Sequence, residues 1–463
     1  MEVMYLKQID NYIVVEENLY SKVEYIMKKN KYRIFLGVQE IAGMMERLYN
    51  AFKEKDITCD FYCMYDYDFS TAGIPQHTPQ ILKRYRKHTN KIRSTDNRNI
   101  KRFWYLFQMV DIIVILFYSL IHYDQYIYIF GHGMFLYNCY LKHIQQLEFW
   151  ILRLFKKNII IWCCGSDTRA PYCDCDIYNG NIEKMWEDTK QKCKKVQMLE
   201  KYGTLIDSQA SSHFHTKPYI VYSSIGIPVD ENEKVEKKNH ENEKVTILHA
   251  PSNQKYKGTH IVRKIIEELI EEGYSIEYIE VSGETHDTVL EKVALADMVV
   301  DQVFSDTPMP GLATESSLNG IPVIIAGYYA ELYKNVYSNP IPPTVYCMPE
   351  ELKENIINLI NNRDKRVSIG EGQKRFVEEN WMSDKVAERF CRIFDGDIPK
   401  EWIFDPKDNS YIFGGGLEKE EVIRNVVLLI EKYGENALCL IKEGVLFSEY
   451  KKVYLQYKDK VYK

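Results

Sequence analysis

The 463-residue chain lacks an excess of positive charge, because Asp and Glu outnumber Lys and Arg and leave a net charge of −6. Proteins dedicated to nucleic-acid binding carry a basic surface, so this balance argues against nucleic acid as a partner. The first residues, MEVMYLKQIDNYIVVEE, contain no basic segment followed by an apolar run and a small-residue cleavage site. We therefore expect no signal peptide and a cytoplasmic location.

The eleven cysteines lack the regular spacing of a disulfide framework. Cys163-Cys164 and Cys173-Asp174-Cys175 are close in sequence, but C-x-C lacks the two-residue gap that is usual in zinc sites. In a chain without an export signal, scattered cysteines are expected to be reduced thiols. The sequence therefore predicts no metal site and no cofactor, with a metal at these cysteines as the alternative.

Strands and helices alternate through most of the chain, which predicts βαβ units and parallel sheets covered on both faces. The charged stretch 230–244, DENEKVEKKNHENEK, cannot bury a face and is interpreted as a solvated linker. It separates an N-terminal domain (1–229) from a C-terminal domain (245–395), and an extension of unknown role (396–463) follows. The predicted fold class is α/β, with two doubly wound Rossmann-like domains facing across a cleft and a C-terminal extension.

The predicted elements follow from short apolar runs and from helical spacing. Strands are expected at 33–38, 57–65, 126–130, 158–163, 204–207, 245–250, 275–281, 297–303, 321–326 and 344–347. Helices are expected at 40–53, near 137–155, and at 183–202, 259–271, 287–296, 312–319, 349–361, 364–379 and 418–433.

The first candidate site is HAPSNQKYKGT, which follows the strand at 245–250 and opens a helix with Thr259 as a candidate N-cap. Free backbone N–H groups and the helix dipole favour an anion at such a position, and Lys257 adds a positive charge. A diphosphate is the natural ligand for this arrangement. An ordinary polar loop between a strand and a helix is the alternative.

The second candidate site is the long loop DQVFSDTPMPGLATE, which carries Asp301, Asp306 and Glu315. A carboxylate at the carboxyl end of a strand can accept two hydrogen bonds from a vicinal diol such as that of ribose. The alternative is that Glu315 only favours the N-terminus of its helix electrostatically.

The third candidate site is GSDTR, directly after the strand at 158–163. Asp167 and Arg169 are expected to face the cleft between the domains. His132, in GHG after the strand at 126–130, is expected to lie nearby. A lone His or Asp is usually structural, but two polar loops at neighbouring strand ends favour a functional site equally.

Together these segments resemble the GT-B glycosyltransferases, most closely those of glycosyltransferase family 4, over roughly residues 30–395. HAPSNQKYKGT, ADMVVDQ and GLATESSLNGIPVI are similar, in that order, to the donor-binding domain of the family. GEGQKRFVEENWMSDKVAERFCRIF is similar to its closing helices, and EIAGMM, FGHG and CGSDTR resemble loops of its acceptor-side domain.

The resemblance implies a nucleotide diphosphate sugar as co-substrate, with Lys257 contacting the diphosphate and Glu315 the ribose. The residues it implies for donor binding are Ser252, Asn253, Lys257, Gly258, Gly311, Leu312 and Glu315. The candidate catalytic residues are Lys257, Asp167, His132 and Asp306. The candidate acceptor contacts are Gly43, Gly133 and Arg169. Where the family motif has a first glutamate, this chain has Thr307 with Asp306 beside it.

The expected reaction is transfer of the sugar to an acceptor hydroxyl with retention, in bacterial-type glycan or glycoconjugate synthesis. The leaving phosphate oxygen then takes the acceptor proton, whereas an inverting enzyme would use Asp167 or His132 as the base. A glycan, a lipid-linked molecule or a protein is the acceptor. Two other functions remain open: a nucleotide-sugar epimerase of the same fold, and a catalytically inactive GT-B partner subunit.

A basic segment precedes an apolar one, FWYLFQMVDIIVILFYSLI, in the region 83–120. Its nine basic residues are Lys83, Arg84, Arg86, Lys87, Lys91, Arg93, Arg98, Lys101 and Arg102. Gln108 and Asp111 interrupt the apolar run, so a spanning helix is not expected. One interpretation is a solvated loop followed by a core helix. The other is peripheral contact with an anionic membrane, at its inner face, where a lipid-linked acceptor would lie.

Overall fold

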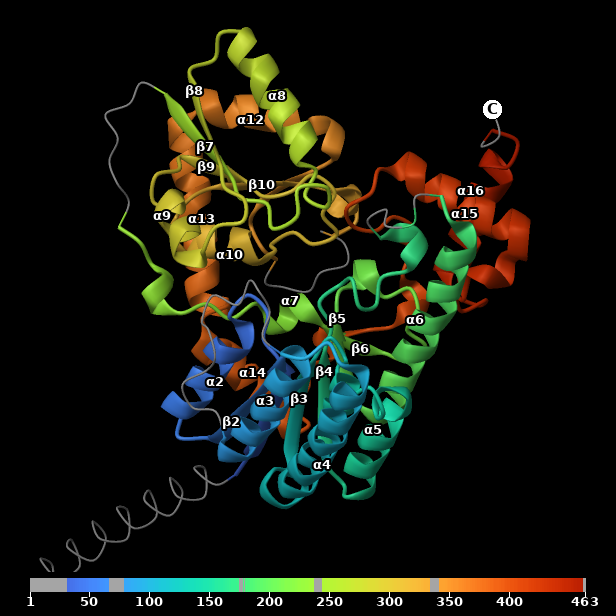
Figure 1. Cartoon of the computed structure of the whole chain (residues 1–463). Coiled ribbons are helices and arrows are strands. Elements are labelled where there is room, and N and C mark those ends of the chain that lie inside the picture. The colour runs from blue at the N-terminus through green and yellow to red at the C-terminus, as the bar shows by residue number, and fades with distance from the viewer. Residues whose placement is uncertain are drawn as a thin grey trace, which may run out of the picture.

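The computed structural model describes residues 31–65, 79–174, 178, 180–236, 244–333 and 341–460. These residues form two α/β units, one above the other, that meet near the short helix α7 (Tyr222–Ile225) (Figure 1). Each unit is built around a largely parallel sheet. We call them the N-terminal unit and the C-terminal unit.

The N-terminal unit contains a seven-stranded sheet in the order β2-β1-β3-β4-β5-β6-β12. All neighbours pair in parallel except β12, which pairs antiparallel with β6 at the edge. The strands are β1 (Arg33–Gln39), β2 (Thr58–Tyr65), β3 (Gln125–Ile129), β4 (Asn158–Trp162), β5 (Thr204–Asp207), β6 (Tyr219–Val221) and β12 (Ile403–Phe404). This order is doubly wound, with the switch point for ligand binding between β1 and β3.

Helices cover both faces of this sheet. They include α2 (Met44–Glu54), α3 (Gln80–Arg93), α4 (Arg98–His122), α5 (Gln145–Leu154) and α6 (Ile182–Tyr202). Side chains of α4, α5 and α6, among them Ile115 and Phe149, form the core on one face. On the other face α2 packs against α14 (Ser383–Phe394), where the rings of Phe52 and Phe390 lie 6.5 Å apart. The helix α14 follows the C-terminal unit in sequence, yet it completes the core of the N-terminal unit.

The C-terminal unit contains a five-stranded parallel sheet in the order β8-β7-β9-β10-β11. Its strands are β7 (Val245–His249), β8 (Ile276–Glu280), β9 (Met298–Val300), β10 (Val323–Ala326) and β11 (Val345–Cys347). Its helices are α8 (Thr259–Glu271), α9 (His286–Val293), α10 (Gly311–Leu318), α12 (Leu352–Asn361) and α13 (Arg363–Asn380). The strands β9 and β10 are buried along their whole length, as expected of parallel strands covered on both faces.

The predicted fold class is confirmed, because both sheets have doubly wound strand orders and helices on both faces. Two predicted elements differ. The helix expected near 137–155 consists of the 3-10 turns η1 (Met134–Tyr137) and η2 (Lys142–Ile144) before α5. Thr259 is not the N-cap of α8 but its first residue. Its hydroxyl lies 2.9 Å from Nε2 of His249 and is therefore used inside the unit.

The charged stretch that we interpreted as a solvated linker is ordered where it begins, and there the prediction is wrong. Asp230 caps the 3-10 turn η5 (Glu231–Glu233), and Glu233 is buried. Burial is tolerated because an arginine of the N-terminal unit pairs with this carboxylate. Residues 237–243, the middle of the stretch, lie outside the described residues.

The main chain passes between the units twice, and both passages lie together. On the way out, Val229 donates its N–H to the carbonyl oxygen of Trp381 at 3.2 Å. On the way back, Ser383 donates its N–H to the carbonyl oxygen of Val229 at 2.9 Å. The outgoing and returning segments are therefore bonded to each other.

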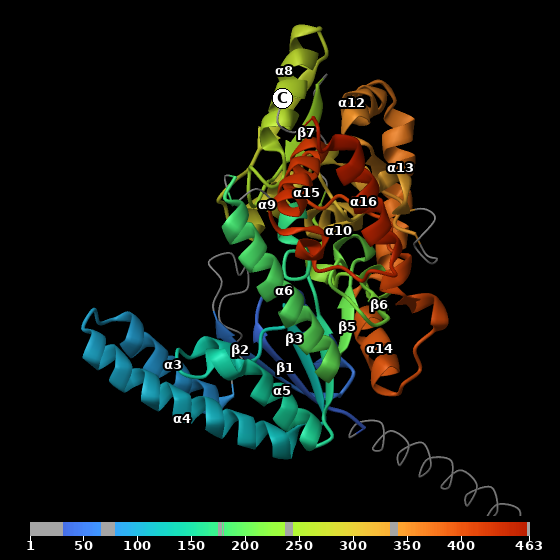
Figure 2. The same ribbon diagram turned by 90° about the vertical axis from the view of Figure 1, so that its right-hand side faces the viewer.

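The described part of the extension, residues 396–460, packs against the N-terminal unit. After β12 it forms α15 (Lys419–Tyr433) and α16 (Val445–Tyr457), which lie beside α6 in both views (Figures 1 and 2). The helix near 418–433 was expected, whereas α16 was not. Val196 of α6, Val426 of α15 and Tyr450 of α16 are buried in one apolar cluster.

Candidate functional site

The loop between β7 and α8 brings Lys257 to the carboxyl end of the C-terminal sheet. Gly258 is the N-cap of α8 with a left-handed φ of 67°, and a Cβ there would meet Val303 at 2.8 Å. Glycine alone suits both conditions. The ammonium of Lys257 donates to Oδ1 of Asp301 at 2.8 Å. This pair holds a positive charge beside a helix start, where the helix dipole also favours an anion.

Ser252 and Asn253, predicted to bind the donor, are exposed in the same loop. The side-chain oxygen of Asn253 accepts the backbone N–H of Tyr256 at 2.9 Å. Such side-chain turns are common for Asn, and this one orients the segment that carries Tyr256. Ser252 is exposed to solvent in this loop, and its role in donor binding stays a prediction.

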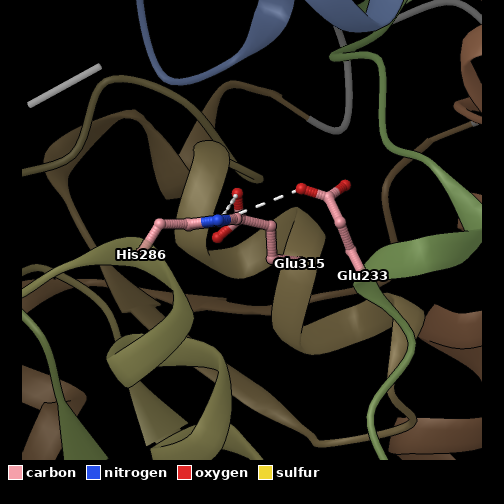
Figure 3. Close-up of side chains that lie close together, drawn as sticks. All are labelled: Glu233, His286 and Glu315. Atoms are coloured by element: carbon pink, nitrogen blue, oxygen red, sulfur yellow. Dashed lines mark hydrogen bonds and ion pairs between the residues drawn. The ribbon is translucent and has the colours of Figure 1, made fainter. Parts of the chain in front are cut away.

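Glu315 lies in α10 and is buried in a group of charged side chains that joins the two units. Its Oε1 accepts hydrogen bonds from Nη2 of Arg47 at 3.1 Å and from Nε2 of His286 at 2.9 Å. Arg47 also pairs with Glu233. We call Arg47, Glu233, His286 and Glu315 the Arg47 cluster. Figure 3 shows the last three converging from η5, α9 and α10.

The charges of the Arg47 cluster shift one another's proton affinities. Burial alone would raise the pKa of Glu315, but the hydrogen bond from His286 and the charge of Arg47 hold it below its ordinary value. The hydrogen bond to Glu315 raises the pKa of His286. Burial raises the pKa of Glu233 in spite of Arg47. Burial opposes protonation of Arg47, but the two carboxylates raise its pKa overall.

Three members of the Arg47 cluster offer one metal-ligand atom each, and these atoms lie within 4.8 Å of one another. Arg47, however, contacts both carboxylates. Its guanidinium therefore supplies the positive charge that a cation would otherwise bring. We interpret the cluster as a link between the units and not as a metal centre.

Arg169 forms a second link between the units. Its Nε donates to Oδ2 of Asp306 at 2.8 Å, and its Nη1 donates to Asp174 at 3.0 Å and to the hydroxyl of Tyr256 at 2.8 Å. We call these four residues the Arg169 cluster. Burial opposes the charge of Arg169, but Asp306 and the neighbouring groups raise its pKa far above its ordinary value. Arg169 was expected to face the cleft between the domains, and its bond to Asp306 of the C-terminal unit is a contact that the sequence did not predict.

Asp167 and His132, the alternative bases, lie on adjacent loops of the N-terminal unit near Lys195. Oδ1 of Asp167 accepts the N–H of Cys164 at 2.9 Å, while its Oδ2 has no partner among the described residues. Burial, followed by the charge of Asp207, raises the pKa of Asp167. Burial, followed by the charge of Lys195, lowers the pKa of His132 to about 3. His132 is therefore a neutral imidazole at neutral pH and a weaker base than Asp167.

The remaining predicted glycine positions fall at two places. Gly311 and Leu312 open α10, are half-buried, and follow Pro310, which provides no side-chain cap. The first N–H groups of α10 are therefore available to a ligand. Gly43 is the buried N-cap of α2, and Gly133 lies directly against the carboxylate of Glu148. Their role as acceptor contacts stays a prediction.

The turn Gly414-Gly415-Gly416 of the extension reaches the Arg169 cluster. A Cβ on Gly415 would lie 2.6 Å from the hydroxyl of Tyr256 and 3.1 Å from Cζ of Arg169. Gly416 donates its N–H to the carbonyl oxygen of Phe304 at 2.9 Å. The extension therefore packs against the junction of the units as well as against α6.

No family model and no curated protein matches the sequence. Among solved structures, Alr3699/HepE of Anabaena in complex with UDP and glucose is 9% identical, with a TM-score of 0.43, over 79% of this chain and 99% of that chain. Sucrose-phosphate synthase from Thermosynechococcus elongatus is 12% identical, with a TM-score of 0.49, over 78% and 98%. A putative UDP-N-acetylglucosamine 2-epimerase from Listeria monocytogenes is 10% identical, with a TM-score of 0.39, over 80% and 97%.

All three scores lie below 0.5, so these likenesses decide nothing about the activity of this chain. The architecture rests instead on its own strand order and register.

Four residues at the junction were missed by sequence reasoning: Arg47, Glu233, His286 and Tyr256. Arg47 follows the glycine of EIAGMM within the helix that we expected, and nothing in its neighbourhood marks it as an interdomain residue. Glu233 was hidden in a charged stretch. Tyr256 lies inside the predicted diphosphate loop, so its proximity to Lys257 was the one available signal.

Proposed function

We propose that this chain is a GT-B glycosyltransferase of the family 4 type that moves a sugar from a nucleotide diphosphate sugar to an acceptor hydroxyl. The observation that carries the proposal is the convergence at the unit junction. Tyr256, next to Lys257 in the loop after β7, contacts Arg169 of the opposite unit there, and Glu315 of α10 contacts Arg47. Positive charge and free N–H groups at the carboxyl ends of parallel strands suit a diphosphate.

The donor would displace existing pairs when it binds. Lys257 would turn from Asp301 to the diphosphate, and a ribose diol would replace one of the two donors that now serve Glu315. Exchange of one charged partner for another avoids leaving a buried charge unpaired. The acidic neighbours Asp301 and Glu315 thus balance the positive charges of Lys257 and Arg47.

Transfer with retention places the chemical demand on the leaving diphosphate. Lys257 and the start of α8 would stabilise its developing charge, and fixed donors of this kind contribute about 3 kcal/mol each. The phosphate oxygen would then take the proton of the acceptor hydroxyl. If the sugar is inverted, Asp167 is the better base, because its pKa is raised while that of His132 is lowered.

The decisive experiment measures release of nucleoside diphosphate by Lys257→Ala. We expect turnover to fall by one to three orders of magnitude, roughly the effect of one preorganised donor. Lys255→Ala is the matched control, because Lys255 is an exposed lysine of the same loop. Unchanged turnover in Lys257→Ala would remove the assignment.

The role of Glu315 is tested by calorimetry with a nucleoside diphosphate. Glu315→Gln keeps the shape of the side chain but removes the charge that attracts the ribose hydroxyls. We expect weaker binding by about tenfold, corresponding to loss of one charge-assisted hydrogen bond. Wild-type affinity in this variant would exclude contact with the ribose.

A second candidate function is that of an inactive partner subunit, and one observation favours it. Arg169 and Glu315 are paired with side chains of the opposite unit, so these two residues also serve to hold the units together. Lys257 is paired within its own unit. Incubation with a panel of nucleotide sugars separates the two functions. The active enzyme releases a nucleoside diphosphate from at least one of them, and the inactive subunit from none.

A further inference from the structure

The outward face of α4 and α5 exposes an unusual amount of apolar surface. Fifteen of the twenty large hydrophobic side chains that are exposed in the described residues belong to the region 100–155. We call them the apolar face: Ile100, Phe103, Leu106, Phe107, Val110, Val114, Phe117, Tyr118, Ile121, Tyr140, Ile144, Leu147, Trp150, Leu154 and Phe155. Exposed apolar residues are ordinarily scattered, and a concentration of this kind marks a contact surface.

The helix α4 differs from an ordinary surface helix because it is apolar on its outer side as well as on its inner side. Surface helices turn their apolar side to the protein and their polar side to water. In α4 the polar residues Gln108, Asp111 and Ser119 are buried, whereas Phe103, Phe117 and others along the opposite side are exposed. Such a pattern fits a helix whose outer surroundings are apolar.

The buried polar groups of α4 are used inside the protein. Asp111 pairs with Arg84 and His88 of α3, and the amide of Gln108 donates to Thr89 at 2.9 Å. These contacts fix the rotation of α4 about its axis, so that the apolar side must point outward. The outward direction of this apolar side is therefore fixed by the packing of α3 on α4.

A rim of positive charge lies beside the apolar face. Our interpretation of the basic segment as a solvated loop was wrong, because most of it forms the helix α3. Lys83, Lys87, Lys91, Arg98 and Arg102 are exposed along α3 and the start of α4. Asp111 is paired and buried. This leaves Asp96 as the one exposed acid among the described residues 79–122.

The helix α4 is, by length and composition, the one helix of the described residues that satisfies the requirements for crossing a membrane. It does not cross one in this fold. Ile112, Ile115 and Leu116 are buried in the core beside β1 and β3, and crossing would remove them from it. The apolar side is therefore suited to lie along a surface.

We propose that the apolar face, flanked by the basic helix α3, docks on a membrane surface that contains anionic phospholipid. The apolar side chains would enter the boundary between headgroups and acyl chains, where the exposed Trp150, Tyr118 and Tyr140 are favoured. The lysines and arginines of the rim would meet the lipid phosphates. A second copy of this chain fits less well, because it would bring a like-charged basic rim toward this one.

Co-sedimentation of the full chain with vesicles provides the test and does not involve sugar transfer, so it stands or falls separately from the enzymatic proposal. We expect binding to vesicles of mixed phosphatidylglycerol and phosphatidylcholine at low salt. Raising the salt should weaken this binding. Absence of binding to these vesicles at low salt would overturn the proposal.

Two variants separate the apolar and the charged contributions. Phe103→Ser/Phe107→Ser/Phe117→Ser should abolish binding, since each substitution removes an exposed aromatic ring. Ile270→Ser/Val367→Ser/Leu455→Ser is the matched control, because these apolar residues are equally exposed but lie elsewhere. Lys83→Glu/Lys87→Glu/Lys91→Glu should weaken binding to anionic vesicles by about a hundredfold or more. Equal binding by the aromatic variant and the control would contradict the proposal.

Fluorescence reports directly on contact with lipid. Brominated acyl chains should quench Trp150, and Trp150→Phe should lose that part of the quenching. The competing occupant, a second copy, is identified by sedimentation velocity without vesicles. A dimer that dissociates in the aromatic variant, together with unquenched Trp150, would replace the membrane by a second copy of this chain.

Discussion

The Arg47 cluster and the Arg169 cluster join the same two units, yet they are built from different chemistry. In each, an arginine of the N-terminal unit pairs with a buried acid of the C-terminal unit. The Arg169 cluster adds Asp174 and a tyrosine, whereas the Arg47 cluster adds a second glutamate and a histidine. The Arg47 cluster therefore contains a histidine, whereas the Arg169 cluster contains none.

This difference bears on how each link responds to pH. Histidine is the side chain whose ordinary pKa lies closest to neutral pH, and His286 bonds Glu315 directly. The Arg169 cluster contains no histidine, and its arginine bonds two aspartates and a phenol. The Arg47 cluster is therefore the link that we expect to respond to acidity.

The largest effect is expected for Arg169→Ala, which breaks the link that contains no histidine. It leaves the buried Asp306 without its charged partner, and such losses cost up to about 5 kcal/mol in the free energy of unfolding. Urea denaturation measures this. The double variant Arg169→Ala/Asp306→Ala should recover part of the loss, and a double variant no more stable than the single one would contradict the pairing.

Arg47→Ala should be less damaging, with a loss of about 3 kcal/mol. His286 still bonds Glu315 in this variant, and Glu233 takes up a proton readily because its pKa is raised. The deficit should therefore shrink between pH 7 and pH 5. A deficit that is independent of pH would show that the two clusters behave alike and would remove the distinction between them.

His286→Gln tests how much the Arg47 cluster contributes to the pH dependence of the free energy of unfolding. The folded-state pKa of His286 is raised, so its stabilising charge is fully present below its ordinary pKa of 6.5 and is lost as pH rises through the folded-state value. We expect the wild type to exceed the variant by about 1 kcal/mol near pH 6, with the difference declining at alkaline pH. Thermal or urea unfolding across pH 5.5–9 checks the sign, and a difference that grows with pH would reverse it.

The smallest effect is expected for Lys419→Ala, which removes an exposed ion pair between the extension and Glu350. The two atoms lie 2.8 Å apart, but both side chains are largely in water. Exposed pairs contribute about 1 kcal/mol or less. This variant is the reference against which the buried arginines are judged, and a loss as large as that of Arg47→Ala would mean that burial is not the deciding factor.

The alternation of strands and helices predicted most of the architecture, because parallel strands and amphipathic helices leave local patterns. Lys257 could also be placed in the loop after a strand from the sequence alone, whereas Glu315, expected near a helix start, lies beyond the first turn of α10. Their present partners could not be predicted, since Asp301 is a neighbour only through sheet pairing, and Arg47 and His286 come from segments far apart in the chain. Contacts that are made by tertiary packing leave no local periodicity.

The extension and the apolar face show the same limit in another form. The Gly414-Gly415-Gly416 turn was visible in the sequence, but the reason for its glycines was not. Arg169 and Tyr256 lie so close to the turn that they leave no room for side chains at Gly415 and Gly416. The hydrophobicity of 103–121 was equally visible, whereas the direction in which it points is set by Asp111 binding α3. Composition predicts that a segment is apolar, and only packing decides which of its sides meets the core.

The paired passages of the chain at Val229 and Trp381–Ser383 determine how the units can turn relative to each other. Both connecting segments lie at one spot and are bonded together, so they act as a common pivot. The Arg47 cluster adjoins this pivot, because Nη1 of Arg47 donates to the carbonyl oxygen of Pro228 at 3.1 Å. Rotation of one unit would change backbone dihedrals at few residues, in the manner of a hinge. Separation of the two units would then require the ion pairs across the junction to be exchanged for contacts with water or with a ligand. The hydrogen bonds between the two connecting segments would stay formed.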